Sequence, residues 1–179
     1  MEYSSDYKGR EDEIISLFNA TFSASEGPDE GKVIGVLVKN LFETTKDKDL
    51  LVFLAWQEKE LVGVIISSRL IYPKDERSVF ILGPVAVATS WQRKGIGQAL
   101  LTHGLNALRE FGVDVAITYG DPNYYSKVGF KHITEEVAQA PLTLQQPDGW
   151  LAQPLNGHLL NPLKGPSHCV EALNDSIYW

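Results

Sequence analysis

Apolar residues near the start of the chain recur every three or four positions, the spacing of one face of an α-helix. Over residues 11–22 this stripe predicts a first helix, and its leading acidic residues suit a helix N-terminus. A second stripe over residues 33–42 predicts another amphipathic helix. Between them, residues 25–29 contain a glycine and a proline that indicate a turn, and residues 44–49 form a polar loop.

Strand-like and helix-like patterns then alternate along the chain. The expected elements are strands at residues 50–57 and 61–71, a strand starting at Val79, a helix at 95–111, a strand at 113–119 and a short helix at 123–128. Asp121 is a good N-cap for the short helix, and Pro122 is a good first helical residue. Because strand–helix–strand–helix order favours parallel pairing, we expect an α/β fold with parallel strands at the centre of a mixed sheet.

Length and composition indicate one α/β domain, since 179 residues with 44% apolar content can bury a substantial core. The amino-acid composition changes after Ala138, because residues 140–164 are rich in Pro, Gly, Gln and Asn. We therefore expect a core at residues 1–139 and a C-terminal extension at 140–179 packed on the same domain. The final Tyr178-Trp179 pair can line a binding site, pack on the core or form a homodimer contact, and all three alternatives stay open.

Charge and cysteine content narrow the class of partner. The net charge of −7 argues against nucleic acid and favours a cationic ligand such as an amine. Cys169 is the only cysteine, so no intrachain disulfide forms; we interpret it as a small hydrophobe rather than a catalytic thiol. The first residues lack the order of a signal peptide, and no apolar run approaches the ~20 residues of a membrane span. We expect a cytoplasmic protein without a membrane partner.

The most informative segment is the glycine-rich turn between the strand that starts at Val79 and the helix at 95–111. A helix N-terminus has unpaired backbone N–H groups and a partial positive charge, so it attracts anions. Gly95 and Gly97 remove side chains that would block close approach, while Arg93 and Lys94 add positive charge. This arrangement predicts a pyrophosphate-binding site.

Two nucleotide motifs with glycine-rich turns do not fit this segment. No G-x-x-x-x-G-K-[S/T] run of a P-loop occurs in the chain. The dinucleotide fingerprint needs a small residue where Leu100 stands, and an acidic residue at the end of the next strand, whereas Asp114 lies near its start. A glycine turn that merely separates a strand from a helix is the remaining structural alternative.

Two segments together resemble the GCN5-related N-acetyltransferase (GNAT) family. Gln92-Arg-Lys-Gly-Ile-Gly97 is similar to the family's acyl-CoA signature Q/R-x-x-G-x-G/A, and Tyr125-Ser-Lys-Val-Gly-Phe130 is similar to its Y-x-x-x-G-F element. The sequences of residues 82–87 and 120–125 resemble those of the YhbS-like subgroup most. The resemblance covers about residues 50–133 and includes the order of the motifs and the helix and strand between them.

The resemblance implies a GNAT fold, whose strongly twisted mixed sheet has splayed parallel central strands. It implies acetyl-CoA as cosubstrate, with pantetheine inserting where the strands splay. The implied cofactor-binding residues are Val85, Ala86, Val87, Arg93, Lys94, Gly95, Ile96, Gly97 and Gln98. From the residues themselves, Gly83-Pro84 predicts a bulge, because proline cannot donate to a strand ladder; a proline at an ordinary strand end is the alternative.

The implied reaction moves an acetyl group from acetyl-CoA to a primary amine of a small molecule or protein, by direct attack in a ternary complex. Tyr125 matches the family's general acid, and the alternative is that it only packs or binds the cofactor. We expect its neighbour Tyr124 to face elsewhere. One departure is Thr118, where many family members have an asparagine that contacts the cofactor.

The general base has no sequence signature. Four carboxylates are equivalent candidates: Glu26, Glu30, Glu43 and Asp121. His103 is expected to pack, and His132, His158 and His168 lack metal-ligand spacing, so we expect no metal. Two non-enzymatic alternatives stay open, a non-catalytic acyl-CoA-binding sensor and a structural subunit with a vestigial cleft.

Overall fold

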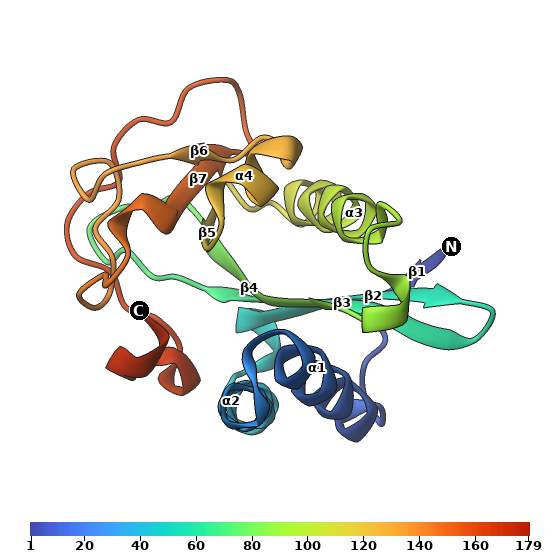
Figure 1. The fold of residues 1–179 in the computed structure, drawn as a ribbon. Coiled ribbons are helices and arrows are strands. Elements are labelled where there is room, and N and C mark those ends of the chain that lie inside the picture. Colours follow the sequence, from blue (N-terminus) through green and yellow to red (C-terminus); the bar gives the residue numbers. More distant parts are fainter. The chain divides into compact units, whose positions relative to one another are not determined.

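The computed structural model describes residues 1–179 as eleven helices and strands with short 3₁₀ turns between them (Figure 1). The helices are α1 (Glu11–Glu26), α2 (Pro28–Thr44), α3 (Ile96–Glu110) and α4 (Pro122–Tyr125). The strands are β1 (Glu2–Ser4), β2 (Leu50–Gln57), β3 (Glu60–Arg69), β4 (Val79–Val87), β5 (Val115–Tyr119), β6 (Lys131–His132) and β7 (Trp150–Pro154). They form a mixed sheet in the order β1-β2-β3-β4-β5-β7-β6, which confirms the α/β class expected from the sequence.

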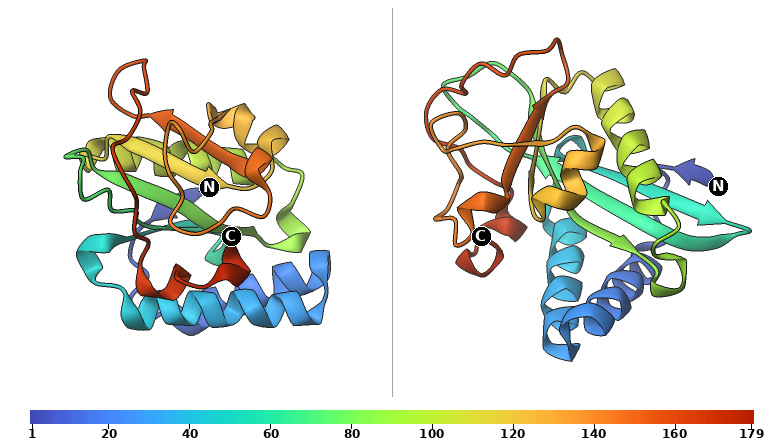
Figure 2. Two further views of the ribbon diagram at one scale, coloured as in Figure 1. Left: turned by 90° about the vertical axis from the view of Figure 1, so that its left-hand side faces the viewer. Right: turned by 45° about the horizontal axis from the view of Figure 1, so that its top comes forward.

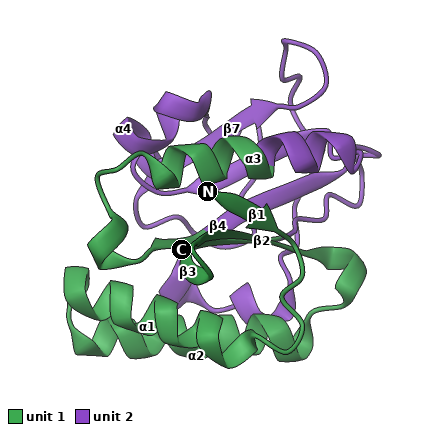
Figure 3. Cartoon of the chain, turned by 90° about the vertical axis from the view of Figure 1, so that its right-hand side faces the viewer, with its two compact units in different colours: residues 1–67, 84–104 green, residues 68–83, 105–179 purple.

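Two compact units divide the chain (Figure 3). Unit 1 consists of residues 1–67 and 84–104, and unit 2 consists of residues 68–83 and 105–179. The chain passes from one unit to the other inside β3, inside β4 and inside α3, so these three elements contribute residues to both.

In unit 1, α1 and α2 are the two helices expected from the apolar stripes, and each is longer than its stripe. They lie side by side (Figure 2) and are joined at Gly27, whose φ of +103° favours glycine. Pro28 then begins α2. The helices approach closely at Gly31, where an added Cβ would lie 1.9 Å from Ser23 Oγ. A larger residue at this position would therefore push the two helices apart.

The strands of unit 1 lie between these helices and the first turns of α3 (Figure 3). Two glycines allow α3 to approach the strands: a Cβ on Gly63 would lie 3.0 Å from Leu100, and one on Gly104 would lie 3.1 Å from Phe53. His103 stacks on Tyr3 with ring centroids 4.4 Å apart, so it packs as the sequence suggested. Tyr3 belongs to β1, a strand that the sequence pattern did not reveal and that pairs antiparallel with β2.

In unit 2, β4 and β5 form the expected parallel pair, with Val79 opposite Val115 and Leu82 opposite Thr118. The sequence pattern missed β7, which pairs antiparallel with both β5 and β6. This strand comes from the stretch rich in Pro, Gly, Gln and Asn, so part of that stretch lies inside the sheet.

The charged turn before β4 is fastened to the C-terminal part of unit 2. Asp75 Oδ1 accepts hydrogen bonds from the backbone N and the Nε of Arg77, both at 3.0 Å. Its Oδ2 accepts from Arg77 Nη2 at 2.8 Å and from the Lys164 backbone N at 3.0 Å. Arg77 also donates to the carbonyls of Asn161 and Pro162, at 2.7 and 2.8 Å. This Asp75–Arg77 clasp therefore fixes residues 161–164 to the turn.

Candidate active site

Unit 1 carries the first group of candidate residues, in the loop that leads into α3. β4 ends at Val87, and a 3₁₀ turn follows before the helix begins at Ile96. Gln92 Nε2 donates to the Val87 carbonyl at 3.0 Å and closes the loop on the strand end. Arg93 and Gly95 have φ values of +62° and +80°, which turn the chain sharply into the helix.

The start of α3 is suited to bind an anion. Its first backbone hydrogen bond joins the Ala99 N–H to the Gly95 carbonyl at 3.1 Å, so the N–H groups of Ile96, Gly97 and Gln98 have no partner inside the helix. These groups carry the positive end of the helix dipole. A Cβ added at Gly95 would meet no atom within 4 Å, so the space beside the loop is open there.

Two cations reinforce the positive charge of this loop. Arg93 and Lys94 are exposed, and neither forms an ion pair with a carboxylate. Lys94 Nζ lies 4.6 Å from the centroid of the Trp91 ring, which orients that ammonium group. The loop therefore combines free backbone donors with uncompensated positive charge.

The pairing of β4 with β5 stops where the sequence predicted a bulge. The ladder between β4 and β5 ends at Leu82 and Thr118, directly before Gly83 and Pro84. Gly83 has a φ of +154°, and Pro84 has no N–H to donate. After this interruption Ala86 is buried, whereas Val85 and Val87 on the alternate face are half-buried.

Unit 2 carries the second group of candidate residues, which surrounds Tyr125. Asp121 caps α4, because its Oδ1 accepts a hydrogen bond from the Asn123 N–H at 2.9 Å, and Pro122 is the first helical residue, as predicted. The Tyr125 ring lies against Gly120, where an added Cβ would come within 2.7 Å of its Cε2. It also meets the buried Phe130 edge-on, with ring centroids 5.7 Å apart.

The glycine of the Y-x-x-x-G-F element explains the contact between Tyr125 and Phe130. Gly129 adopts a left-handed conformation with a φ of +98° and ends the 3₁₀ turn that follows α4. A Cβ there would also lie 3.1 Å from the Gln153 side chain, whose Nε2 donates to the Val128 carbonyl at 3.0 Å. Glycine thus lets the chain reverse, and the reversal brings Phe130 back to Tyr125.

Burial raises the pKa of Tyr125 to about 12, and the nearby Thr118 hydroxyl offsets part of this rise. The phenol is therefore protonated at neutral pH and can act as a proton donor. Thr118 is itself buried and donates its hydroxyl to the Leu82 carbonyl at 2.8 Å. Thr118, which stands where many family members have an asparagine, therefore stabilises the end of the β4–β5 ladder in this chain.

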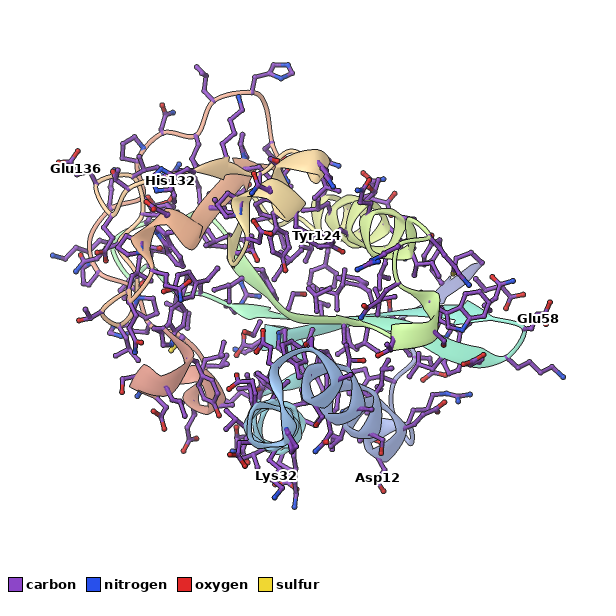
Figure 4. All side chains as sticks on the ribbon, in the orientation of Figure 1. Asp12, Lys32, Glu58, Tyr124, His132 and Glu136 are labelled. Carbon is purple, nitrogen blue, oxygen red and sulfur yellow. The ribbon has the colours of Figure 1, made fainter.

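The sequence predicted that Tyr124 faces away from Tyr125, but the structure shows otherwise. The two rings meet edge-on with centroids 5.1 Å apart, and burial raises the pKa of Tyr124 as well. Tyr124 belongs to α4 and is labelled in Figure 4. The two phenols thus share one environment, although only Tyr125 has the motif position.

The carboxylates proposed as bases have ordinary structural surroundings. Asp121 is the cap of α4, and Glu43 forms an exposed ion pair with Lys39 at 4.0 Å. Glu26 is exposed at the end of α1, and Glu30 lies in the first turn of α2. No three His, Cys, Asp or Glu side chains are grouped in a way that could hold a metal ion. None of the helices has the length and apolarity of a membrane span.

Comparison with known proteins identifies the family of this domain. Residues 48–132 match the family model described as an acetyltransferase (GNAT) domain. The chain carries a GNAT domain. Both motif segments, residues 92–97 and 125–130, lie within the match, and the predicted resemblance is confirmed.

Relatives of this GNAT domain include two proteins of Escherichia coli strain K12. The uncharacterized N-acetyltransferase YjhQ is 28% identical over 140 residues, which cover 75% of this chain and 77% of YjhQ. The uncharacterized N-acetyltransferase YhbS is 30% identical over 74 residues, which cover 41% of this chain and 44% of YhbS. That sequence match spans less than half of YhbS.

Solved structures share the GNAT fold over almost the whole chain. E. coli YhbS in complex with CoA superposes with a TM-score of 0.81 at 23% identity, covering 98% of this chain and 92% of YhbS. A GNAT acetyltransferase from Brucella melitensis in complex with acetyl-CoA superposes with a TM-score of 0.71 at 23% identity, covering 97% of both chains.

One pocket of unit 2 was missed by sequence reasoning. It lies at the C-terminal end of β5 and is lined partly by residues close to the end of the chain. The aromatic pair Tyr178-Trp179 was the only sequence signal for it. Of the three alternatives for this pair, packing on the core applies to Trp179, which is only 3% exposed.

Proposed function

We propose that this protein is an acetyl-CoA-dependent N-acetyltransferase that acetylates a primary amine of a small molecule or of a protein. The amine attacks the thioester directly, in a ternary complex. The observation that carries the proposal is the open N-terminus of α3 with its two unpaired cations, Arg93 and Lys94, inside the segment that matches the GNAT family. The CoA and acetyl-CoA in the YhbS and Brucella structures support the same ligand here.

In this proposal the loop binds the diphosphate of acetyl-CoA. The backbone N–H groups of Ile96, Gly97 and Gln98 donate to the phosphate oxygens, and the side chains of Arg93 and Lys94 add charge. Glycine at position 95 leaves the open space that the phosphates need.

The second half of β4 binds the pantetheine arm in the same proposal. Pro84 and the interrupted ladder free the strand from regular pairing with β5, so its backbone groups can pair with a ligand instead. Backbone groups of Val85, Ala86 and Val87 bind the pantetheine amides and polarise the thioester carbonyl.

Tyr125 serves as the general acid in the proposed reaction. The amine nitrogen forms a bond to the thioester carbon, the carbon–sulfur bond breaks, and Tyr125 donates its proton to the departing sulfur. The proton lost by the amine returns through solvent to the phenolate. The raised pKa of Tyr125 supports this role, because the proton is present on the phenol at every physiological pH.

The experiment is a CoA-release assay against a panel of primary amines and peptides, with the Tyr125→Phe variant beside the wild type. Tyr125→Phe keeps the ring contacts with Gly120 and Phe130, so folding and acetyl-CoA affinity should persist while turnover falls by about 10²–10⁴-fold. Tyr124→Phe is the matched control and should retain turnover. Saturable acetyl-CoA binding without turnover on any acceptor would instead favour the acyl-CoA-binding sensor.

A further inference from the structure

The pocket at the C-terminal end of β5 has a volume of about 220 Å³ and lies entirely within unit 2. Three segments line it: the end of β5, the loop before β7 and the last residues of the chain. The lining residues are Tyr119, Gly120, Gln145, Gln146, Gly149, Ile177, Tyr178 and Trp179. Pockets for whole small ligands usually exceed ~300 Å³, so this one has room for a single ring or residue of a larger ligand.

Aromatic rings hold the walls of this β5-end pocket in place. Tyr119 and Trp179 stack with centroids 6.0 Å apart and an interplanar angle of 17°. Trp150 meets both rings edge-on, at 6.2 and 6.1 Å. Trp150 Nε1 donates to the Ala138 carbonyl and Trp179 Nε1 to the Leu173 carbonyl, each at 2.8 Å. The indole N–H groups are therefore occupied, and Trp179 offers a ligand only its apolar surface.

Uncharged polar groups complete the pocket. The Tyr119 oxygen accepts a hydrogen bond from the Gln146 backbone N at 2.7 Å, which leaves its own O–H available as a donor. Gln145 Nε2 donates to the Ser176 carbonyl at 3.2 Å, which leaves its side-chain oxygen available as an acceptor. None of the lining side chains is charged, so a charged group entering the pocket would lose water without meeting a side chain of opposite charge.

The pocket and Tyr125 share one neighbour, Gly120. Gly120 belongs to the pocket lining, and the Tyr125 ring lies against this same glycine, so closely that an added Cβ would come within 2.7 Å of Cε2. Gly120 N donates to the Gly149 carbonyl at 2.9 Å, which ties the loop before β7 to this junction. A ligand that contacts Gly120 in the pocket is therefore separated from the ring of the proposed general acid by this one residue.

We propose that the β5-end pocket binds an uncharged, ring-sized part of the acyl acceptor, with Tyr119 as hydrogen-bond donor and Trp179 as apolar wall. This inference rests on the proposed acetyltransferase function. The net charge of −7 favours a cationic acceptor, but the inference assigns the selectivity for the acceptor to a pocket without charged side chains. The reacting amine itself stays outside the pocket.

The first test compares three benzylamines that differ only in the para substituent: a hydroxyl, a carboxylate or a quaternary ammonium group. The hydroxyl compound should have a kcat/KM at least about tenfold above the two charged ones. Ile177→Trp, which adds bulk to the pocket lining, should raise the KM for the hydroxyl compound about tenfold or more and leave the KM for acetyl-CoA unchanged. Val36→Trp on α2 is the matched control, since Val36 and Ile177 are 55% and 59% exposed.

A second variant tests the hydrogen bond. Tyr119→Phe should raise the KM for 4-hydroxybenzylamine about fivefold to tenfold, but not the KM for unsubstituted benzylamine. Equal use of charged and neutral amines, or an unchanged KM in Ile177→Trp, would overturn the inference.

Direct binding separates failure of the pocket from failure of the proposed function. If the wild type acetylates none of these amines, binding of 4-hydroxybenzylamine is measured by ligand-observed NMR. Binding that Ile177→Trp abolishes and Val36→Trp retains would support the pocket even though the acetyltransferase proposal has failed. No binding to the wild type would reject the pocket as well.

Discussion

The Asp75–Arg77 clasp provides the sharpest prediction about stability. Asp75 accepts four hydrogen bonds, three from Arg77 and one from the Lys164 backbone, and its side chain is only 6% exposed. Asp75→Asn keeps the shape, but an NH₂ group replaces one of the two carboxylate oxygens, so the donors that faced that oxygen lose their acceptor. Hydrogen bonds to a charged group contribute about 1.5–3 kcal/mol, and an unsatisfied buried donor costs a similar amount. We expect the variant to lose about 2–4 kcal/mol of unfolding free energy.

The pH dependence of this loss follows from the pKa of Asp75. Hydrogen bonds from Arg77 hold the pKa of the folded carboxyl well below its usual value of ~3.9. A carboxyl with a depressed pKa stabilises the folded state above the unfolded pKa, and that stabilisation is lost as the pH falls through the folded pKa. The difference between wild type and Asp75→Asn should therefore be complete at neutral pH and shrink as the pH falls below ~4.

The assay is urea denaturation at neutral pH and at a series of lower pH values, followed by tryptophan fluorescence. Asp47→Asn is the matched control, because its ion pair with Lys8 is short, at 2.8 Å, but its side chain is 80% exposed. That variant should behave as wild type. A loss of under about 1 kcal/mol in Asp75→Asn at neutral pH, or a loss independent of pH, would refute the reasoning.

Three further outcomes follow from the proposed site. Gly95→Val should lower the affinity for acetyl-CoA about 100-fold or more, measured by calorimetry. The control Gly9→Val has a similar φ of +82° and open surroundings and should bind acetyl-CoA normally. Equal affinities of the two variants would contradict the assignment of this loop as the diphosphate-binding site. Gly120→Val should displace the Tyr125 ring and reduce turnover at least about tenfold while acetyl-CoA affinity persists, so unchanged turnover would show that the ring position is unimportant. Because the pKa of Tyr125 is about 12, kcat should show no loss from deprotonation of this group up to about pH 10; an alkaline loss below that pH that is absent in Tyr125→Phe would contradict the raised pKa.

Some elements could be predicted from the sequence because their signals are local. The stripes of α1 and α2 repeat within one helix, and the cap of α4 needs only Asp121, Pro122 and the Asn123 N–H, which are adjacent in the chain. The turn into α3 and the interruption at Gly83-Pro84 depend likewise on backbone preferences of single residues. The family motif lies on these same local structures, so it could be recognised before the fold was known.

Other parts of the protein depend on contacts between distant segments. The five residues of β7 have no alternating pattern, and they form a strand because β5 and β6 offer ladders on both sides. Thr118 could be predicted only as a departure from the family pattern, whereas the structure shows its hydroxyl on the Leu82 carbonyl, 36 residues away. The expectation for Tyr124 failed for the same reason, since helical spacing alone takes no account of how the two rings pack.

The sequence by itself thus determined the order of the elements from α1 to α4, the glycine-rich turn into α3 and the tyrosine that follows β5. Tertiary structure was needed for the β5-end pocket, where Tyr119, Trp150 and Trp179 meet across 60 residues of chain. The physical reason is the range of the interactions. Capping, turn preference and helical periodicity act over a few residues and leave a readable pattern, whereas stacking of distant aromatic rings depends on the path of the whole chain and leaves none.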